Sequence, residues 1–177
     1  MLAISIKDVQ KKEQRTHAHN LLRECLKVCG IDYIQDKTPV VRNEHGKPSL
    51  KDYPEIHYNM SHADGITACM LSDSECGIDC ENVRQYRPNV VKRVFSESEK
   101  ILLENTPENE RDLLFFRLWT LKEAYVKAIG TGISYPMNTA EFSFEGKHIA
   151  TNIKGFKFKQ YILKNKKYVV SICRKIQ

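Results

Sequence analysis

The sequence predicts an α+β protein built as a pseudo-dimer of two similar halves, each a small antiparallel sheet packed with helices. Segments 9–29 and 109–129 carry apolar residues at helical spacing. From about residue 140 the chain alternates apolar and polar residues, which is typical of antiparallel strands. A faint repeat links the halves, since three residues of one helix recur 100 positions later: Leu21, Lys27 and Gly30 as Leu121, Lys127 and Gly130.

The expected first half covers residues 1–75. Residues 2–6 alternate as a short strand, and residues 9–29 form the first helix, which Gly30 ends. A polar stretch containing proline then leads to Gly46-Lys47-Pro48. Residues 57–71 read as two strands around a turn at Gly65, with the sequence Tyr58-x-x-Ser61 recurring later as Tyr168-x-x-Ser171.

The expected second half covers residues 76–177. It begins with a strand at 76–81, followed by a helix at 96–105. Ser96 and Glu99 form a capping-box pattern at the start of that helix. The strongest helix, 109–129, ends at Gly130, and strands are expected at 141–144, 156–163 and 168–173.

Composition indicates an ordinary globular protein. The 177 residues are 41% hydrophobic and 28% charged, and no apolar run approaches the roughly 18 residues of a membrane span. The N-terminus becomes charged too soon for a secretory signal, so we expect a cytoplasmic protein without membrane association.

The six cysteines include no Cys-x-x-Cys pair and have mostly apolar neighbours. We therefore expect buried free thiols. A zinc site is the alternative, since Cys25 and Cys29 share the four-residue spacing of Cys76 and Cys80, but supporting histidines are missing.

The formal charge of +6 indicates either a solvated basic surface or an anionic partner. That partner could be nucleic acid, a phosphorylated cofactor or an acidic protein. The sequence lacks RNA-binding aromatic motifs, zinc fingers and long basic runs, so we expect no nucleic-acid partner.

Asp79 and Glu81 lie two apart in Gly77-Ile78-Asp79-Cys80-Glu81, so on a strand they project from one face. Two neighbouring carboxylates repel unless a proton or cation intervenes, and such hard oxygen ligands suit Mg²⁺. The alternative is the exposed polar face of an edge strand.

Glu123 and Lys127 share one face of the second long helix. An i,i+4 ion pair is one interpretation. The other is phosphoryl chemistry, in which a carboxylate holds a metal or takes a proton while the ammonium neutralises phosphate oxygens.

A third group comprises Gly46-Lys47-Pro48 and Asn59-Met60-Ser61-His62. Gly-Lys-Pro is typical of a turn, and a lysine beside a rigid turn can also bind phosphate. Ser61 and His62 can donate hydrogen bonds to phosphate. A serine nucleophile paired with His62 is disfavoured, because adjacent strand residues point in opposite directions.

These motifs, followed by Phe95-Ser96-Glu97 and by Trp119 to Gly132, together resemble the 4′-phosphopantetheinyl transferase family. The resemblance covers residues 46–136 and is nearest to the fused, two-half, surfactin-synthetase-activating type. Residues 77–177 also look like one subunit of the shorter, trimeric holo-carrier synthases. The region before Gly46 is shorter than is usual in the fused type.

This resemblance implies transfer of 4′-phosphopantetheine from coenzyme A to a serine of an acyl or peptidyl carrier protein, with release of 3′,5′-ADP. By this resemblance Asp79, Glu81 and Glu123 hold Mg²⁺, and Glu123 and Lys127 act in catalysis. The coenzyme A contacts implied by the resemblance are Arg15, Lys47, Pro48, Ser61, His62 and Lys127. The first half would contact the nucleotide, and the second would carry the carboxylates and catalytic helix.

A fused pair of halves implies a monomer. Three alternatives stay open at this stage: a catalytically inactive coenzyme A-binding protein of the same fold, an Mg²⁺-dependent phosphohydrolase or nuclease, and a basic nucleic-acid-binding module. The sequence also leaves open which carrier is modified, whether acyl-coenzyme A is accepted, which basic residues hold the 3′-phosphate, and whether Glu123 or a water takes the serine proton.

Overall fold

The computed structural model describes residues 1–176, apart from the side chain of Ile133. In chain order the first half contains β1 (Leu2–Ile6), the short 3-10 helix η1 (Lys11–Glu13), α1 (Gln14–Val28), β2 (Val40–Arg42), β3 (Pro48–Leu50), β4 (His57–Ala63) and β5 (Ile66–Ser72).

The second half contains β6 (Cys76–Asn82), α2 (Pro88–Val94), α3 (Glu97–Asn105), α4 (Glu108–Ile129), η2 (Gly132–Ser134), η3 (Met137–Thr139), β7 (Phe142–Glu145), β8 (His148–Thr151), β9 (Phe156–Leu163) and β10 (Tyr168–Lys175). The α+β prediction is confirmed, with long helices and antiparallel sheets in each half.

The two halves have the same arrangement of principal elements. Each runs from a strand through a long helix to two further strands, and the last strand lies in the middle of its sheet. The strand orders are β1-β5-β4 and β6-β10-β9, and all neighbouring pairs are antiparallel. Both long helices end at a glycine with a left-handed backbone, Gly30 and Gly130, as the sequence repeat predicts.

The repeated Tyr-x-x-Ser sequence does not occupy equivalent positions in the two halves. Tyr58 and Ser61 lie on the edge strand β4, whereas Tyr168 and Ser171 lie on the central strand β10. The structural counterpart of β4 is the other edge strand, β9. The Tyr-x-x-Ser similarity is therefore a coincidence of composition between strands that occupy different places in their sheets.

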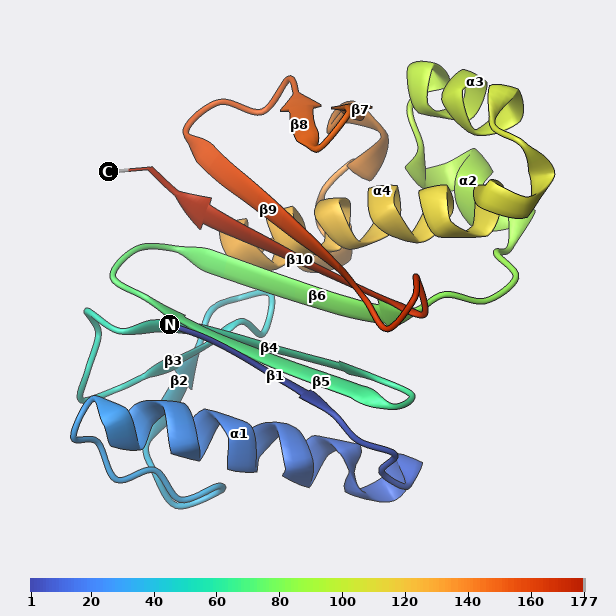
Figure 1. The fold of residues 1–177 in the computed structure, drawn as a ribbon. Helices are drawn as coiled ribbons and strands as arrows, with labels where there is room; N and C mark the ends of the chain where they lie inside the picture. The colour runs from blue at the N-terminus through green and yellow to red at the C-terminus, as the bar shows by residue number, and fades with distance from the viewer. Residues whose placement is uncertain (177) are drawn as a thin grey trace.

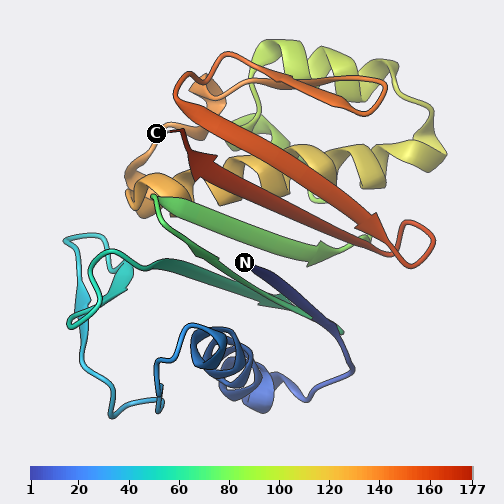
Figure 2. The same cartoon turned by 60° about the vertical axis from the view of Figure 1, so that its left-hand side comes forward.

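The elements form four layers, with α1 covering the outer face of the first sheet and α4 covering the outer face of the second (Figure 1, Figure 2). Strand alternation produces this arrangement, because each central strand has an apolar face on either side. The residues between the sheets are Ile66, Ala68, Met70, Cys76, Ile78, Cys80, Tyr168 and Val170. Separate cores lie under α1 and around α4.

The sheets meet where β4 and β6 lie side by side, and side chains bridge these two edges. Asn59 accepts a hydrogen bond through Oδ1 from the backbone N of Ile78 at 2.8 Å. Ser61 accepts one through Oγ from the backbone N of Cys80 at 3.2 Å. These contacts satisfy donors on an otherwise unpaired edge of β6 and fix its register against β4.

Helix α4 lies directly on β6 at Gly77. A Cβ atom at this position would stand 2.0 Å from the carbonyl oxygen of Ala124 and 2.5 Å from the backbone N of Ala128. Only a residue without a side chain allows this approach. The contact brings the strand face that carries Asp79 and Glu81 against the helix.

The expected strands and helices are confirmed, including the capping box at Ser96 and Glu99, and most ends lie within two residues of their predicted places. The helix expected from residue 9 begins later, with η1 at Lys11–Glu13 and α1 at Gln14. The β2–β3 hairpin, α2, β8 and the 3-10 helices η2 and η3 were not predicted. They are short, and the sequence pattern of a strand or helix of three to seven residues is weak. Within residues 1–176, no helix is long and apolar enough to cross a membrane.

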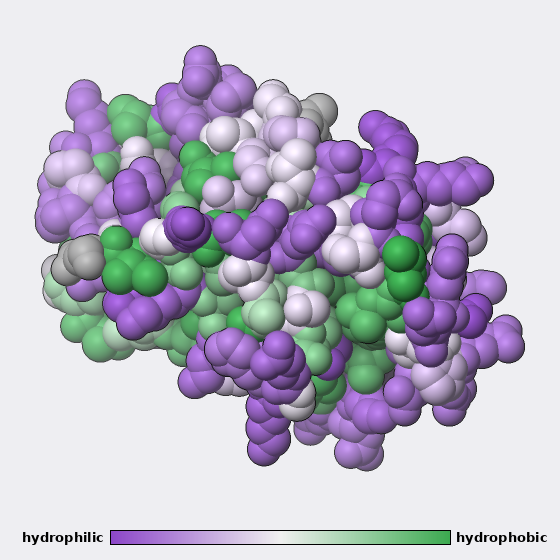
Figure 3. Space-filling view, turned by 90° about the horizontal axis from the view of Figure 1, so that it is seen from above, coloured by the Kyte–Doolittle hydropathy of each residue, from purple (hydrophilic) through white to green (hydrophobic). Residues whose placement is uncertain are grey.

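The prediction of buried free thiols is confirmed for five of the six cysteines. Cys29 is also free but is exposed, because it follows the last turn of α1 on the surface, so the prediction is wrong for this residue. The surface above the second half is mostly hydrophilic, with scattered hydrophobic patches (Figure 3).

We predict that Gly77→Ala lowers the free energy of unfolding by about 1–3 kcal/mol, because the new methyl group forces the α4 backbone away from β6. Urea denaturation measures this loss. Gly155→Ala is the control, since a Cβ there meets nothing within 4 Å and only backbone strain at φ +80° is added. An equal or smaller loss for Gly77→Ala than for Gly155→Ala would contradict the direct helix–strand contact.

Candidate active site

Three of the residues singled out in the sequence meet at the junction of the halves. Lys127 Nζ on α4 lies 2.6 Å from Asp79 Oδ1 on β6. Ser61 on β4 donates to the same oxygen at 2.9 Å, and Lys127 donates to Ser61 Oγ at 3.2 Å. The cluster therefore joins β4, β6 and α4, and it depends on the approach of α4 at Gly77.

Asp79 has one free carboxylate oxygen. The residue is 5% exposed, and its Oδ2 is buried without a hydrogen-bond partner. A buried, unpaired carboxylate oxygen is costly in isolation, which makes it a favourable position for a cation.

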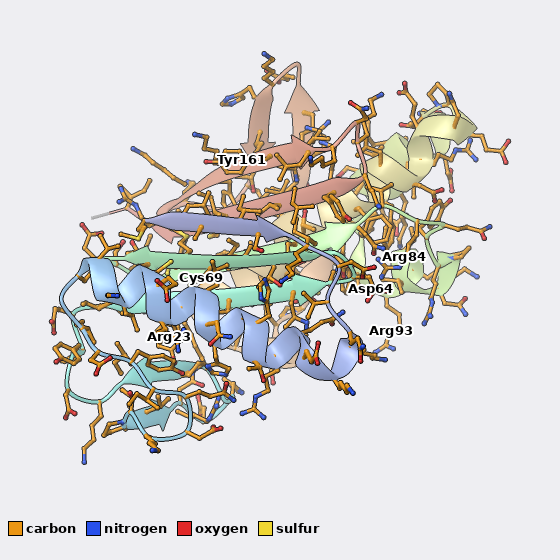
Figure 4. The ribbon with its side chains drawn as sticks, turned by 60° about the horizontal axis from the view of Figure 1, so that its bottom comes forward. Arg23, Asp64, Cys69, Arg84, Arg93 and Tyr161 are labelled. Atoms are coloured by element: carbon orange, nitrogen blue, oxygen red, sulfur yellow. The ribbon has the colours of Figure 1, made fainter. Side chains whose placement is uncertain are left out.

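Glu81 lies on the same face of β6 as Asp79, two residues further along. Its Oε2 accepts a hydrogen bond from Arg84 Nη1 at 2.8 Å. Burial raises the pKa of Glu81, and the nearby Asp79 adds to the rise, while Arg84 opposes it. Arg84 comes from the segment after β6 (labelled in Figure 4) and also lies over the ring of Phe116. The sequence analysis did not identify Arg84, whose only signal is its position three residues after Glu81.

Glu123 is the third carboxylate. Burial raises its pKa to about 7, and the negative charges of Asp79 and Glu81 contribute in the same direction against the opposing effect of Lys127. Lys127 is paired with Asp79, so the i,i+4 ion pair with Glu123 is not the arrangement observed. Glu123 is consequently a carboxyl group whose proton is exchangeable near neutral pH.

Two cavities flank Glu123. The first, about 290 Å³, lies between the β2–β3 turn, β4 and the end of α4. Its lining includes Lys47, Pro48, Asn59, Glu123 and Lys127. The second, about 980 Å³, is lined only by the second half, mainly by residues 85–94 and 135–138. Glu123 and Met137 line both cavities, so Glu123 lies where the two spaces meet.

The Gly-Lys-Pro turn docks on the C-terminal end of α4. Asn43 Nδ2 donates to the carbonyl oxygen of Gly130 at 2.8 Å, and Lys47 Nζ donates to those of Cys76 and Ala128. The ammonium of Lys47 thus interacts with one carbonyl at the negative end of α4 and with one at the start of β6. Burial lowers the pKa of Lys47. Its side chain forms part of the first cavity while its charge is held by the backbone.

Two predicted contacts lie apart from this cluster. Arg15 on α1 pairs with Asp36 at 3.8 Å, and its side chain is 69% exposed. The Nδ1 atom of His62 lies 3.2 Å from Oε1 of Gln14, at the start of α1. Ser61 and His62 therefore point in opposite directions, as expected for neighbours on a strand. Burial lowers the pKa of His62, and the charge of Lys127 adds to this effect.

Asn59 is a further residue of the site that the sequence analysis quoted without assigning a role. It is 8% exposed, lines the first cavity and holds the backbone of β6 through its Oδ1 atom. The sequence could have indicated Asn59, because it lies two residues before Ser61 and therefore on the same strand face.

The site contains the kind of donor atoms that bind Mg²⁺. Three carboxylates gather near the end of β6 and the middle of α4, two have raised pKa values, and Asp79 has an unpartnered oxygen. In the part of the chain that the structure describes, no three His, Cys, Asp or Glu side chains form a ready-made metal cluster. Instead, Lys127 and Arg84 neutralise Asp79 and Glu81.

We predict that Glu123→Gln stabilises the metal-free protein at pH 8 but has little effect at pH 5. The folded-state pKa of about 7 exceeds the ordinary 4.5, so the ionised carboxylate costs stability increasingly as pH rises through this interval. Relief of this cost is worth about 1–3 kcal/mol at pH 8. Denaturant titrations in chelator check it, with the exposed Glu145→Gln as control; a gain independent of pH would contradict it.

Comparisons with known proteins show the family of this chain. Residues 75–173 match the 4′-phosphopantetheinyl transferase superfamily. The chain is 40% identical over 98 residues to 4′-phosphopantetheinyl transferase gsp of Aneurinibacillus migulanus, covering 55% of this chain and 40% of that protein. It is 33% identical over 114 residues to Sfp of Bacillus subtilis strain 168, covering 63% and 51%.

The chain thus spans about half the length of these curated relatives. Among solved structures, Thermotoga maritima holo-[acyl-carrier-protein] synthase is similar, with 20% identity and a TM-score of 0.49 over 59% of this chain and 64% of that chain. Because the superfamily match includes β6, α4 and the three carboxylates and covers more than half of the sequence, this chain belongs to the 4′-phosphopantetheinyl transferase superfamily.

Proposed function

We propose that this protein transfers 4′-phosphopantetheine from coenzyme A to a serine of an apo carrier protein in an Mg²⁺-dependent reaction. The products are the holo carrier protein and 3′,5′-ADP. The observation that carries the proposal is the cluster at the junction of the halves. There Lys127 contacts Asp79 and Ser61, and Glu123 lies between two cavities. Membership of the superfamily supports it.

We assign Asp79, Glu81 and Glu123 as the residues that hold Mg²⁺. The unpartnered Oδ2 of Asp79 and the raised pKa of Glu123 support this assignment. When bound, the ion would neutralise negative charge on the pyrophosphate of coenzyme A.

The nucleotide end of coenzyme A is proposed to lie beside the first cavity, against residues 1–75. Lys47 and Pro48 line this cavity together with Lys127. Ser61 and His62 on β4 and Arg15 on α1 are the further contacts proposed from the family resemblance. Residues 76–177 would carry the carboxylates and the catalytic helix.

The chemistry assigns one task to each catalytic side chain. The Oγ atom of the carrier serine attacks the β-phosphorus of coenzyme A, and its proton passes to Glu123. The bond between this phosphorus and the bridging oxygen breaks, and 3′,5′-ADP leaves. Lys127 stabilises negative charge on the transferred phosphoryl group. Without a bound cation, burial raises the pKa of Glu123 to about 7, and a bound Mg²⁺ would keep the carboxylate ionised.

The large second cavity is the proposed side of approach for the carrier. Its lining includes Glu123 but no residue of the Gly-Lys-Pro turn, and it comes from the second half alone. With the nucleotide on one side of Glu123 and the acceptor on the other, the serine would meet the phosphorus at the carboxylate.

We further propose a monomer in the cytoplasm. Two fused halves already make the contact between sheets that separate subunits would otherwise make, with a shared apolar core. Six free thiols are consistent with a reducing compartment.

The direct test incubates the protein with coenzyme A, Mg²⁺ and a panel of unmodified acyl and peptidyl carriers, followed by intact-mass measurement. A mass gain of one phosphopantetheine arm on a carrier supports the proposal. Coenzyme A binding without any adduct would instead indicate an inactive binding protein, and release of free phosphopantetheine would indicate a phosphohydrolase.

We predict that Glu123→Gln reduces transfer by roughly 10²-fold or more, because it removes the charge and the base while keeping the size of the side chain. Asp79→Asn should be rescued by added Mg²⁺ better than Glu123→Gln, since it weakens the metal site without removing the base. Carrier modification is measured across an Mg²⁺ titration, at a temperature at which circular dichroism shows both variants to be folded. Near-wild-type transfer by Glu123→Gln would refute its role.

We also predict that salt slows the reaction with acidic carriers. All of the net positive charge comes from the C-terminal segment, since residues 146–177 contain nine Lys and Arg and no Asp or Glu. Attraction to an acidic carrier speeds the encounter and is screened over a Debye length of about 8 Å at physiological ionic strength.

The measurement is kcat/KM for the carrier at saturating coenzyme A and fixed Mg²⁺, so that weaker coenzyme A binding in salt does not enter the result. A value that is the same at low and high salt would rule out electrostatic assistance.

A further inference from the structure

Lys122 precedes Glu123 in α4, yet its side chain lies in a different environment. It is 0% exposed and forms an ion pair with Glu99 of α3, which is 1% exposed, with a distance of 2.7 Å between Nζ and Oε2. Neighbouring residues on a helix point about 100° apart. Lys122 therefore faces the interior of the second half, while Glu123 faces the two cavities.

The ammonium of Lys122 has a partner for each of its three hydrogens. Besides Glu99, it donates to the backbone carbonyl oxygens of Met137 at 2.9 Å and of Ala140. A buried ammonium with all its donors satisfied is fixed in direction and has no donor left for a ligand. Lys122 is therefore not a phosphate contact in this structure, although it lies next to the catalytic carboxylate.

Glu99 is equally well satisfied. Its Oε2 accepts from the backbone N of Ser96 in the capping box of α3, and its Oε1 accepts from the backbone N of Phe142 at the start of β7. The pair thus joins four segments that are separate in sequence: the start of α3, the middle of α4, residues 137–140 and the start of β7.

Residues 137–140 include part of the cavity wall. Met137 lines both cavities beside Glu123, and Asn138 lines the larger one. This wall is a short 3-10 helix, Met137–Thr139, with few backbone hydrogen bonds of its own. Its two carbonyl contacts with Lys122 tie it to the helix that carries Glu123.

We infer that Lys122, together with Glu99, is a positioning residue that holds the 137–140 wall against α4 and so sets the shape of the space beside Glu123. This inference rests on the proposed transferase function for its kinetic consequence, but the structural consequence is independent of it. Lys122 acts through Met137 and the backbone and does not touch the substrate.

An apolar pair often replaces a buried ion pair without loss of stability, whereas removing one partner leaves an uncompensated charge. Comparing single and double variants therefore distinguishes a positioning role of the Lys122–Glu99 pair from a purely stabilising one. Lys122→Met alone should be strongly destabilised by the stranded Glu99. The double variant Lys122→Met/Glu99→Gln leaves no charge at these two positions, so its melting temperature should recover toward that of the wild type. The carbonyls of residues 137 and 140 still lack their donor.

The test compares melting temperature, amide hydrogen exchange of residues 135–142, and kinetics with coenzyme A and carrier. The matched control is Lys100→Met/Glu97→Gln, which removes an ion pair of 2.7 Å on the surface of α3 by the same substitutions. We expect faster exchange of residues 135–142 in the Lys122/Glu99 double variant and a loss of kcat/KM of up to about 10²-fold, a typical cost of small misplacement. The control variant should change neither the exchange of residues 135–142 nor kcat/KM.

Recovery of the melting temperature together with wild-type exchange and kcat/KM would show that the pair supplies stability only, and would overturn the inference. So would a double variant as unstable as Lys122→Met alone. Weakened coenzyme A binding with unchanged exchange would make Lys122 a ligand contact instead, which also overturns it. If the wild type transfers nothing, the proposed function fails, while the exchange result still tests the position of the wall.

Discussion

The contact between α4 and β6 at Gly77 is the constraint on which the rest of the site depends. With no side chain at this position, the backbone of the helix lies against the strand. A buried strand beside a helix normally keeps its polar side chains away from the interface, but here Asp79 reaches Lys127 across it at 2.6 Å. The same close approach gives the site its low exposure, which strengthens each interaction between charges.

A second constraint comes from the way the halves join. The edges of β4 and β6 are bridged by Asn59 and Ser61, and this leaves the Asp79 face of β6 free to form a site with α4. Ser61 has two roles in this arrangement, since it accepts from the β6 backbone and donates to Asp79. The contacts that join the two halves therefore also position Asp79 in the site.

The charges of the site are balanced unevenly. Asp79 forms an ion pair with Lys127, and Glu81 forms one with Arg84. Among the described residues Glu123 forms no ion pair, although the positive charge of Lys127 is close enough to lower its pKa. Burial and repulsion from its two neighbours raise its pKa to about 7. A divalent cation would relieve this repulsion. One helix thus carries Lys122, which is buried in an ion pair with Glu99, directly before Glu123, the proposed catalytic carboxylate.

The sequence by itself determined the class of fold and the principal strands and helices, because helical and strand periodicity and capping are local properties. Its motifs also supplied the candidate carboxylates and lysine of the site. It also predicted correctly that Asp79 and Glu81 share a strand face. Only the tertiary structure decided which partners these residues have. Lys127 pairs with Asp79 rather than with Glu123, Arg84 neutralises Glu81, and Lys122 is buried against Glu99. The contact of Arg84 is local, but the other two join residues more than 20 positions apart. Spacing along one helix or strand carries no information about which element packs against it.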